Sequence, residues 1–339
     1  MGLRFGSDLE AWQRWDAGRR RVRNGVVWLR RRGRHEANPD LYLATRGEAP
    51  SVAVMLESRA ASSQQAFLTP TAHLDAAAVY APFDPTEYLP GDGWQVRQVP
   101  GLELDRQVPE VRTVVAAGSY LDLGGEAHRQ AQARELRFVV VQHGLLTPYA
   151  PPLPPGTHLL AWSDADAAFW RSGRSDVTTA TVGSQLLWEA AQQPRVEVMS
   201  SQPVFLGQLH GAELPRPGMT RAAVVFCRMT GATYRPHPSE RDLLSRLEHK
   251  AFGLAGMEVD HSPAPLASLA RPVAAAYSTG LLEAAARGLP AWAFYPSPPR
   301  WLEEFWERYG LSVWGGDPTP APDQSAVEPA RTVSRGLLG

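Results

Sequence analysis

The chain has 339 residues, a length that usually divides into two domains instead of sharing one core. It is 44% hydrophobic and 20% charged, as is typical of soluble globular proteins, and its net charge of −1 argues against nucleic acid as a partner. The single cysteine, Cys227, excludes an intrachain disulfide and a zinc site made of cysteines. No apolar run approaches the ~20 residues that span a bilayer, so we expect a cytoplasmic protein.

Residues 1–39 are predicted to form a basic N-terminal arm. Between Arg19 and Arg34, eight arginines surround the apolar stretch Val26–Leu29. One interpretation is a solvated arm. A second is an interfacial anchor, in which the arginines meet anionic headgroups and Trp28 sits at the boundary, placing the protein on the inner face of the membrane. A third is a nucleic-acid-binding arm, which is less favoured because no stacking aromatic residues recur beside the arginines.

From residue 51 onward, short apolar runs alternate with helical segments. Strands are predicted at 51–58, 75–82, 111–119, 137–144, 157–163, 177–184, 196–203, 257–262, 291–296 and 311–315, and helices at 126–136, 164–173, 185–193, 220–231, 240–256 and 300–310, with a strand, a turn and a helix over 272–290. Continuous apolar strands that alternate with helices indicate parallel sheets covered on both faces. We therefore predict an α/β fold with two doubly wound halves, 40–185 and 186–316, and a disordered Pro-rich tail, 317–339.

In such sheets the ligand binds beyond the carboxyl ends of the strands, which makes the turns there the place to look for a site. The first turn, "QHG", ends in His143 and Gly144. His143 can act as a general base or contact a phosphate, or it can simply bond to the loop backbone. The second turn presents Gly183 and Ser184 at the start of a helix, where amide groups and a hydroxyl suit an anion or form a plain N-cap.

The third turn, "YRPHPSE", holds a histidine between two prolines. The prolines restrict the backbone, so His237 is predicted to be displayed in a fixed position for an anion or a nucleotide. Arg235 supplies a permanent positive charge nearby, and Ser239 is expected to cap the helix that follows.

The fourth turn, "YSTG", converts a strand into a helix. Ser278, Thr279 and Gly280 bring two hydroxyls and the first amides together, and Glu283 lies one turn into the helix, within reach of a ribose hydroxyl. The simpler interpretation is a capping turn with Glu283 as its partner.

The ordered set "QHG", "VGS", "RPHP" and "STGLLEAAARG" resembles bacterial glycosyltransferases of the GT-B fold that use CMP- or CDP-activated donors. These include capsular Kdo transferases, polysialyltransferases and CDP-glycerol glycerophosphotransferases, and the similarity covers about 137–315. The resemblance implies two Rossmann-type domains that face each other across a crevice, with the acceptor in 40–185 and the nucleotide donor in 186–316.

The resemblance also assigns roles to residues. It implies that His237, Ser278 and Thr279 bind the phosphate and ribose of the nucleotide, and that the general base is His143 or an acidic residue. Because the sialyltransferase acidic motif has no close counterpart here, Asp122 and Glu126 are the acidic candidates. No metal and no cofactor beyond the donor are expected; the pair Asp164 and Asp166 is interpreted as an acidic helix N-terminus.

The resulting hypothesis is an inverting, metal-independent glycosyltransferase. It would transfer a sugar or polyol phosphate to a cell-surface polysaccharide or a teichoic-acid-like acceptor, which can be lipid-linked. The alternatives are a UDP-sugar 2-epimerase or UDP-sugar transferase of the same architecture, and a non-catalytic nucleotide-binding homologue. An epimerase would need more catalytic carboxylates facing the crevice than the sequence shows.

Overall fold

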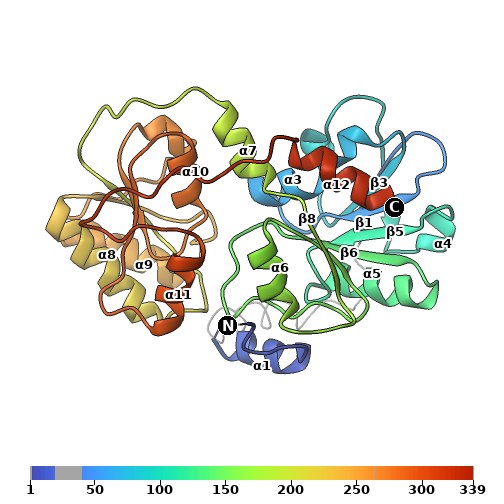
Figure 1. The fold of residues 1–339 in the computed structure, drawn as a ribbon, viewed down its shortest axis with the longest axis horizontal. Helices are drawn as coiled ribbons and strands as arrows, with labels where there is room; N and C mark the ends of the chain where they lie inside the picture. Colours follow the sequence, from blue (N-terminus) through green and yellow to red (C-terminus); the bar gives the residue numbers. More distant parts are fainter. Residues whose placement is uncertain (1, 20–39, 263, 339) are drawn as a thin grey trace. The chain divides into compact units, whose positions relative to one another are not determined.

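The structure is a computed structural model that describes residues 2–19, 40–262 and 264–338. The chain forms two compact units (Figure 1). Unit 1 contains the described residues up to Ala17, residues 40–188 and the C-terminal segment from Ser325. Unit 2 is formed mainly by Glu189–Gln324. The predicted crevice between the two units stays a prediction.

Unit 1 is built on an eight-stranded sheet with the order β4-β1-β3-β2-β5-β6-β7-β8. The strands are β1 (Asp40–Arg46), β2 (Val52–Met55), β3 (Ala77–Ala81), β4 (Gln95–Pro100), β5 (Thr113–Ala116), β6 (Arg137–Val141), β7 (His158–Ala161) and β8 (Thr178–Thr181). From β3 to β8 all neighbours are parallel, and Ala53 of β2 pairs with Ala78 of β3 and Val114 of β5. The sequence predicted these six strands, whereas the antiparallel β1 and β4 were not expected.

The chain passes from β2 outward to β3, then returns to β5 and continues in the other direction to β8. The topological switch point of unit 1 therefore lies between β2 and β5, and their carboxyl ends are the expected place for a ligand. β2 and β5 are buried along their whole length, which explains why they read as continuous apolar runs.

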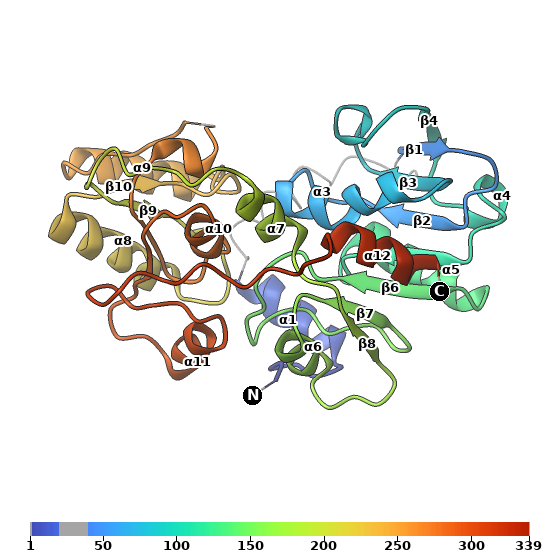
Figure 2. The ribbon, with the colours of Figure 1, turned by 45° about the horizontal axis from the view of Figure 1, so that its top comes forward.

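Helices cover both faces of this sheet (Figure 2). They are α3 (Ala61–Phe67), α4 (Leu104–Gln107), α5 (Asp122–Ala133), α6 (Asp164–Arg171) and α12 (Pro329–Leu338), with the short 3-10 helices η1 (Thr69–His73) and η2 (Thr86–Tyr88). Helix α7 (Gln185–Gln192) begins in unit 1 and ends in unit 2. One core packs α5 and α6 against the sheet, and the other packs α3 and α12 against its opposite face. Unit 1 is thus a three-layered α/β unit.

The described part of the N-terminal arm up to Ala17 packs on unit 1. Helix α1 (Leu9–Arg19) places Trp12, whose Nε1 donates to the carbonyl oxygen of Tyr149 at 2.8 Å, and Trp15 stacks on the Tyr149 ring at 4.9 Å. The arm is therefore partly a structural element of this unit. The anchor predicted between Arg19 and Arg34 lies, apart from Arg19 itself, outside the described residues.

The C-terminal tail departs from its predicted disorder. Helix α12 buries Val333 and Leu337 in the unit 1 core, and the Thr113 hydroxyl donates to the carbonyl oxygen of Leu337 at 3.0 Å. Pro329 stands at the helix start, where proline is tolerated because its missing N–H would have no partner there. The prolines before this helix dominated the composition and concealed its apolar face, so the prediction of disorder is wrong at 329–338.

Unit 2 has a four-stranded parallel sheet with the order β10-β9-β11-β12. The strands are β9 (Val204–Leu206), β10 (Thr233–Arg235), β11 (Val273–Ala275) and β12 (Ala291–Ala293). Parallel bridges from Tyr234 to Val259 and from Ala293 to Val313 extend the sheet at both edges. Counted along the chain, the order is 3-2-1-4-5-6, which is the Rossmann order with its switch point between β9 and β11. The predicted fold class, two Rossmann-type α/β halves, is confirmed.

The helices of unit 2 are α8 (Arg216–Thr230), α9 (Leu243–Leu254), η3 (Leu266–Leu269), α10 (Gly280–Ala286) and α11 (Arg300–Arg308). The strand predicted at 196–203 is wrong. In this segment the backbone N–H of Val196 donates to the carbonyl oxygen of Arg287, and that of Met199 donates to the carbonyl oxygen of Ala270. These bonds do not form a ladder with a neighbouring strand, and the strand begins at Val204 instead. No helix among the described residues is long and apolar enough to cross a membrane.

Candidate functional sites

The loop after β9 lies at the switch point of unit 2 and fits tightly between its neighbours. A Cβ on Gly207 would stand 2.2 Å from the Tyr234 hydroxyl oxygen, and one on Gly211 would stand 2.3 Å from that of Tyr277. The Gln208 Oε1 accepts a hydrogen bond from the Tyr277 backbone N–H at 3.2 Å. The two glycines thus allow the loop to approach both strands, and Gln208 ties it to the end of β11.

Two histidines from different loops stack at this edge. The ring of His210, in the β9 loop, lies 3.9 Å from that of His237, at an angle of 19°. The backbone N–H of Ser239 donates to the His237 Nδ1 at 3.1 Å, so a neutral His237 carries its proton on Nε2. Packing of the ring lowers the pKa of His237, against the opposing pull of the Glu240 charge. His237 therefore offers an uncharged N–H donor at neutral pH.

The carboxylate of Glu240 links these loops. Its Oε1 accepts from the backbone N–H groups of Leu209, at 2.9 Å, and His237, at 3.3 Å. Its Oε2 accepts from the Tyr234 hydroxyl at 2.9 Å and lies 2.9 Å from the His249 Nε2. The residue is buried, and every partner is a hydrogen-bond donor. Sequence reasoning missed Glu240, although its place directly after the proline-rich turn is a usable signal.

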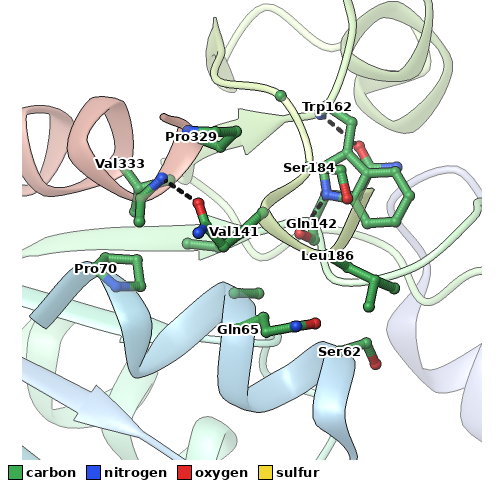
Figure 3. Close-up of a pocket in the computed structure, with 14 residues that line it drawn as sticks. Ser62, Gln65, Pro70, Val141, Gln142, Trp162, Ser184, Leu186, Pro329 and Val333 are labelled. Atoms are coloured by element: carbon green, nitrogen blue, oxygen red, sulfur yellow. Dashed lines mark hydrogen bonds between the residues drawn. The ribbon is translucent and has the colours of Figure 1, made fainter. Parts of the chain in front are cut away.

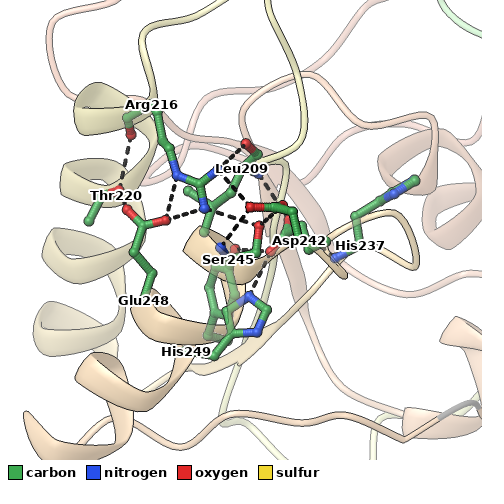
Figure 4. Close-up of polar contacts among 10 residues, drawn as sticks. Leu209, Arg216, Thr220, His237, Asp242, Ser245, Glu248 and His249 are labelled. Atoms are coloured by element: carbon green, nitrogen blue, oxygen red, sulfur yellow. Dashed lines mark hydrogen bonds and ion pairs between the residues drawn. The ribbon is translucent and has the colours of Figure 1, made fainter. Parts of the chain in front are cut away.

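A second polar network joins the helices behind this edge (Figure 4). The Arg216 guanidinium bonds to Glu248, at 2.5 Å, and to the Ser245 hydroxyl, at 3.0 Å. Asp242, not the predicted Ser239, caps α9: its Oδ1 accepts from the Ser245 backbone N–H at 3.0 Å. The helix begins at Leu243, after a turn in which the Glu240 backbone N–H donates to the carbonyl oxygen of His237 at 2.8 Å.

The predicted Arg235 supports the edge of the sheet. Its guanidinium lies 3.6 Å from Asp260 and donates to the carbonyl oxygens of Ser262 and Ala264. Its charge also reaches Glu283, where burial raises the pKa of the carboxyl and the charges of Arg287 and Arg235 oppose that rise. Arg235 is thus held by partners of its own chain.

Ser278, Thr279 and Gly280 follow β11 as predicted. The Ser278 hydroxyl accepts from the Gly280 backbone N–H at 3.2 Å, and a Cβ on Gly280 would stand 2.8 Å from Leu206 of β9. The start of α10 is thus pressed against the end of β9. The carboxyl edge of unit 2 therefore brings the β9 loop together with two of the predicted turns.

Unit 1 has a carboxylate at its own switch point. Glu57 follows β2, and its Oε1 and Oε2 accept from the backbone N–H groups of Leu123, at 2.8 Å, and Gly124, at 3.2 Å. Burial raises the pKa of Glu57 to about 7, and the nearby charge of Asp122 adds to the rise. Sequence reasoning missed Glu57, because its partners lie in a helix far along the chain; its position as the first polar residue after a buried strand was the available signal.

The acidic candidates Asp122 and Glu126 lie on α5. Asp122 is exposed in the first turn, beside Glu57. Glu126 accepts from the Gln130 Nε2 at 2.6 Å and pairs with Arg129, so it is engaged along its own helix. Of the two, only Asp122 belongs to the surroundings of Glu57.

The "QHG" turn is held by its glutamine. The Nε2 of Gln142 donates to Asp166, at 2.9 Å, and its Oε1 accepts from the Trp162 backbone N–H at 2.8 Å. His143 is half-buried beside Phe67, with 5.4 Å between the ring centroids, and burial lowers the pKa of its imidazole. A neutral His143 can accept a proton. Asp166 lies in the first turn of α6, which Ser163 caps.

Gly183 and Ser184 belong to unit 1. The Ser184 hydroxyl accepts from the Leu187 backbone N–H at 3.3 Å, and a Cβ on Gly183 would stand 3.2 Å from Pro329 of α12. With Gln142 they line a small pocket (Figure 3) that has room for about one water molecule. Helix α12 also lines this pocket, and the hydroxyl forms a helix cap; the predicted anion site stays a prediction.

Comparison with known proteins gives little beyond the fold. No family model and no curated protein matches the chain. Two solved structures of UDP-GlcNAc 2-epimerase from Methanocaldococcus jannaschii, one of them in complex with UDP-GlcNAc and UDP, are similar at a TM-score of 0.49 and 11% sequence identity. The similarity covers 85% of this chain and 99% of each epimerase chain.

Proposed function

We propose that the protein is an enzyme that acts on a nucleotide-activated sugar or polyol, and that unit 2 binds the nucleotide. The observation that carries this proposal is the cluster at the unit 2 switch point, where the stacked His210 and His237 adjoin the β9 loop. Rossmann-type sheets bind nucleotides at this position. The hydroxyls of Ser278 and Thr279 belong to the same edge.

These groups suit a phosphate of the leaving nucleotide. The His237 Nε2–H, the Ser278 and Thr279 hydroxyls and backbone amides are hydrogen-bond donors held by the fold, so they need little reorganisation as negative charge develops. Glu240 fixes the backbone on which His210 and His237 stand. We assign it a positioning role.

The first candidate reaction is inverting transfer from a cytidine-activated donor, as the resemblance of the "QHG", "RPHP" and "STG" turns implies. A base removes the proton of the acceptor hydroxyl while the nucleotide leaves. His143, whose pKa is lowered by burial, and Glu57, whose pKa is raised to about 7, are the candidate bases in unit 1. The acceptor would be a cell-surface polysaccharide or a teichoic-acid-like polymer.

The second candidate is epimerisation of a UDP-sugar. One observation favours it: Glu57 is a carboxylate of raised pKa at a sheet switch point, a group that the sequence did not reveal. A carboxyl that titrates near neutral pH can both take and return a proton, as an epimerase requires.

Ligand-induced thermal shifts with CMP, CDP, UDP and GDP test the proposal. Stabilisation that is lost in His237→Ala but kept in His261→Ala, an exposed histidine of the same unit, supports nucleotide binding at the cluster. Preference for a cytidine nucleotide favours transfer and preference for UDP favours the second candidate. The absence of any shift would overturn the proposal, because both candidate reactions need a bound nucleotide.

Incubation with UDP-GlcNAc alone, followed by proton NMR, separates the reactions. Epimerisation alters the sugar without an acceptor, whereas transfer needs one.

A further inference from the structure

Helix α9 turns an apolar face to solvent. Leu243, Leu247 and Leu254 are 65%, 52% and 92% exposed, and their spacing places them on one side of the helix. The opposite side, with His249 and Phe252, is buried. Single exposed leucines are ordinary, but three on one helical face form a patch that usually marks an interaction site.

The neighbouring helix α8 is bonded to α9. The bonds from Arg216 and Thr220 of α8 to Glu248 of α9 hold the two helices together. Figure 2 shows α8 and α9 side by side.

The exposed charges of the two helices have one sign. Arg246 and Lys250 stand beside the leucines on α9, and Arg221 and Arg228 are exposed on α8. Over 216–256, all of it described, the acidic residues are turned inward: Glu240 is buried, while Asp242 and Glu248 pair with Arg216, at 3.8 Å and 2.5 Å.

We propose that this surface, the α9 surface formed by the exposed leucines and basic residues of α8 and α9, docks on an anionic lipid bilayer. An interfacial helix buries apolar side chains at the boundary between headgroups and acyl chains, while basic side chains around it meet anionic headgroups. Leu247 and Leu254 with Arg246 and Lys250 supply both parts. The inference does not depend on the proposed enzyme activity, although a membrane surface would bring the protein to a lipid-linked acceptor.

Charge argues against a second copy of the chain as the partner. A symmetric contact through the α9 surface would bring the basic residues of one copy, Arg246 and Lys250 among them, near those of the other, with no exposed acidic residue over 216–256 to pair with them. Such like-charge contact opposes association, whereas an anionic bilayer supplies the missing negative charge.

Co-sedimentation of the full chain with vesicles tests the proposal. We expect binding to phosphatidylcholine vesicles that contain 30% phosphatidylglycerol, on the order of tenfold weaker binding to pure phosphatidylcholine, and weakening by salt. The variant Leu247→Gln/Leu254→Gln and the variant Arg246→Glu/Lys250→Glu should each reduce binding about tenfold or more. All four positions are exposed, so the fold should be kept, which circular dichroism melting checks.

Matched controls are Leu338→Gln on α12 and Arg106→Glu on α4, whose side chains are exposed on unit 1. They should leave vesicle binding unchanged. The N-terminal arm stays in place in every variant, so undiminished binding of the α9 variants would assign binding to another part of the chain and overturn the proposal. Sedimentation equilibrium gives the other overturning outcome: a dimer that the α9 variants dissociate, with vesicle binding unaffected.

Discussion

The imidazoles of His210 and His237 lie face to face, 3.9 Å apart, although they come from loops that follow different strands. The Glu240 carboxylate accepts hydrogen bonds from the backbone N–H groups of Leu209 and His237, so one side chain holds both histidine-bearing loops. The two histidines therefore form one surface at the switch point of unit 2, and a change at Glu240 should be felt at both rings.

We expect His237→Ala to weaken binding of the nucleotide that produces the largest thermal shift by about 10- to 100-fold. The reason is that a hydrogen bond to a charged phosphate contributes about 1.5–3 kcal/mol. Isothermal titration calorimetry measures the loss, with His261→Ala as the control. Equal affinity of the His237 variant and the wild type would remove this residue from the site.

Glu240→Gln should destabilise the protein by about 2–4 kcal/mol, because the amide of glutamine cannot accept from all the donors that now meet the carboxylate. The control is Glu307→Gln on α11, an exposed position where the change should stay within about 0.5 kcal/mol. Urea denaturation measures both. If the Glu240 variant unfolds at the same urea concentration as its control, the network does not hold the loops.

Most of the unit 1 sheet could be predicted because β2, β5 and their parallel neighbours are buried on both faces, which leaves continuous apolar runs in the sequence. Edge strand β4 could not, since four of its six residues are exposed and three of these four are polar. In unit 2 the prolines around His237 marked its turn correctly. Placing the first strand at 196–203 instead of at Val204–Leu206 hid the loop that carries His210.

Glu57 illustrates a different limit. Its neighbours at the switch point, Leu123 and Gly124, are brought to it by a helix that follows another strand, and only the fold reveals that contact. A raised pKa depends on the burial that results. Local sequence patterns predict neither this contact nor the burial of Glu57.

Stability should fall with rising pH because of Glu57. Its pKa is about 7 in the folded protein and 4.5 as the ordinary value, so between these values the folded state binds more protons than the unfolded state. The contribution of protonated Glu57 to the free energy of unfolding is therefore fully present below pH 4.5 and is lost as the pH rises through 7. We expect the wild type to lose about 1–3 kcal/mol relative to Glu57→Gln between pH 4.5 and 8. Urea denaturation at several pH values measures the difference.

The activity of the enzyme should report on Glu57 separately. If this carboxylate is the base, kcat rises with pH with an apparent pKa near 7, and Glu57→Gln removes that rise along with most of the rate. An unchanged profile in the variant would leave His143 as the candidate base.

The C-terminal helix offers a test with two adjacent leucines. Leu337 is 1% exposed within the unit 1 core, whereas Leu338 is 65% exposed. Leu337→Ala should cost about 2–5 kcal/mol, because it removes apolar contacts and leaves a cavity, while Leu338→Ala should stay within about 0.5 kcal/mol. Urea denaturation of both variants measures the contrast. Equal, small effects would mean that α12 does not pack on unit 1 in solution, and the tail would then be disordered as its prolines suggest. A large effect at Leu337 alone would show that α12 packs in the unit 1 core and stabilises the fold.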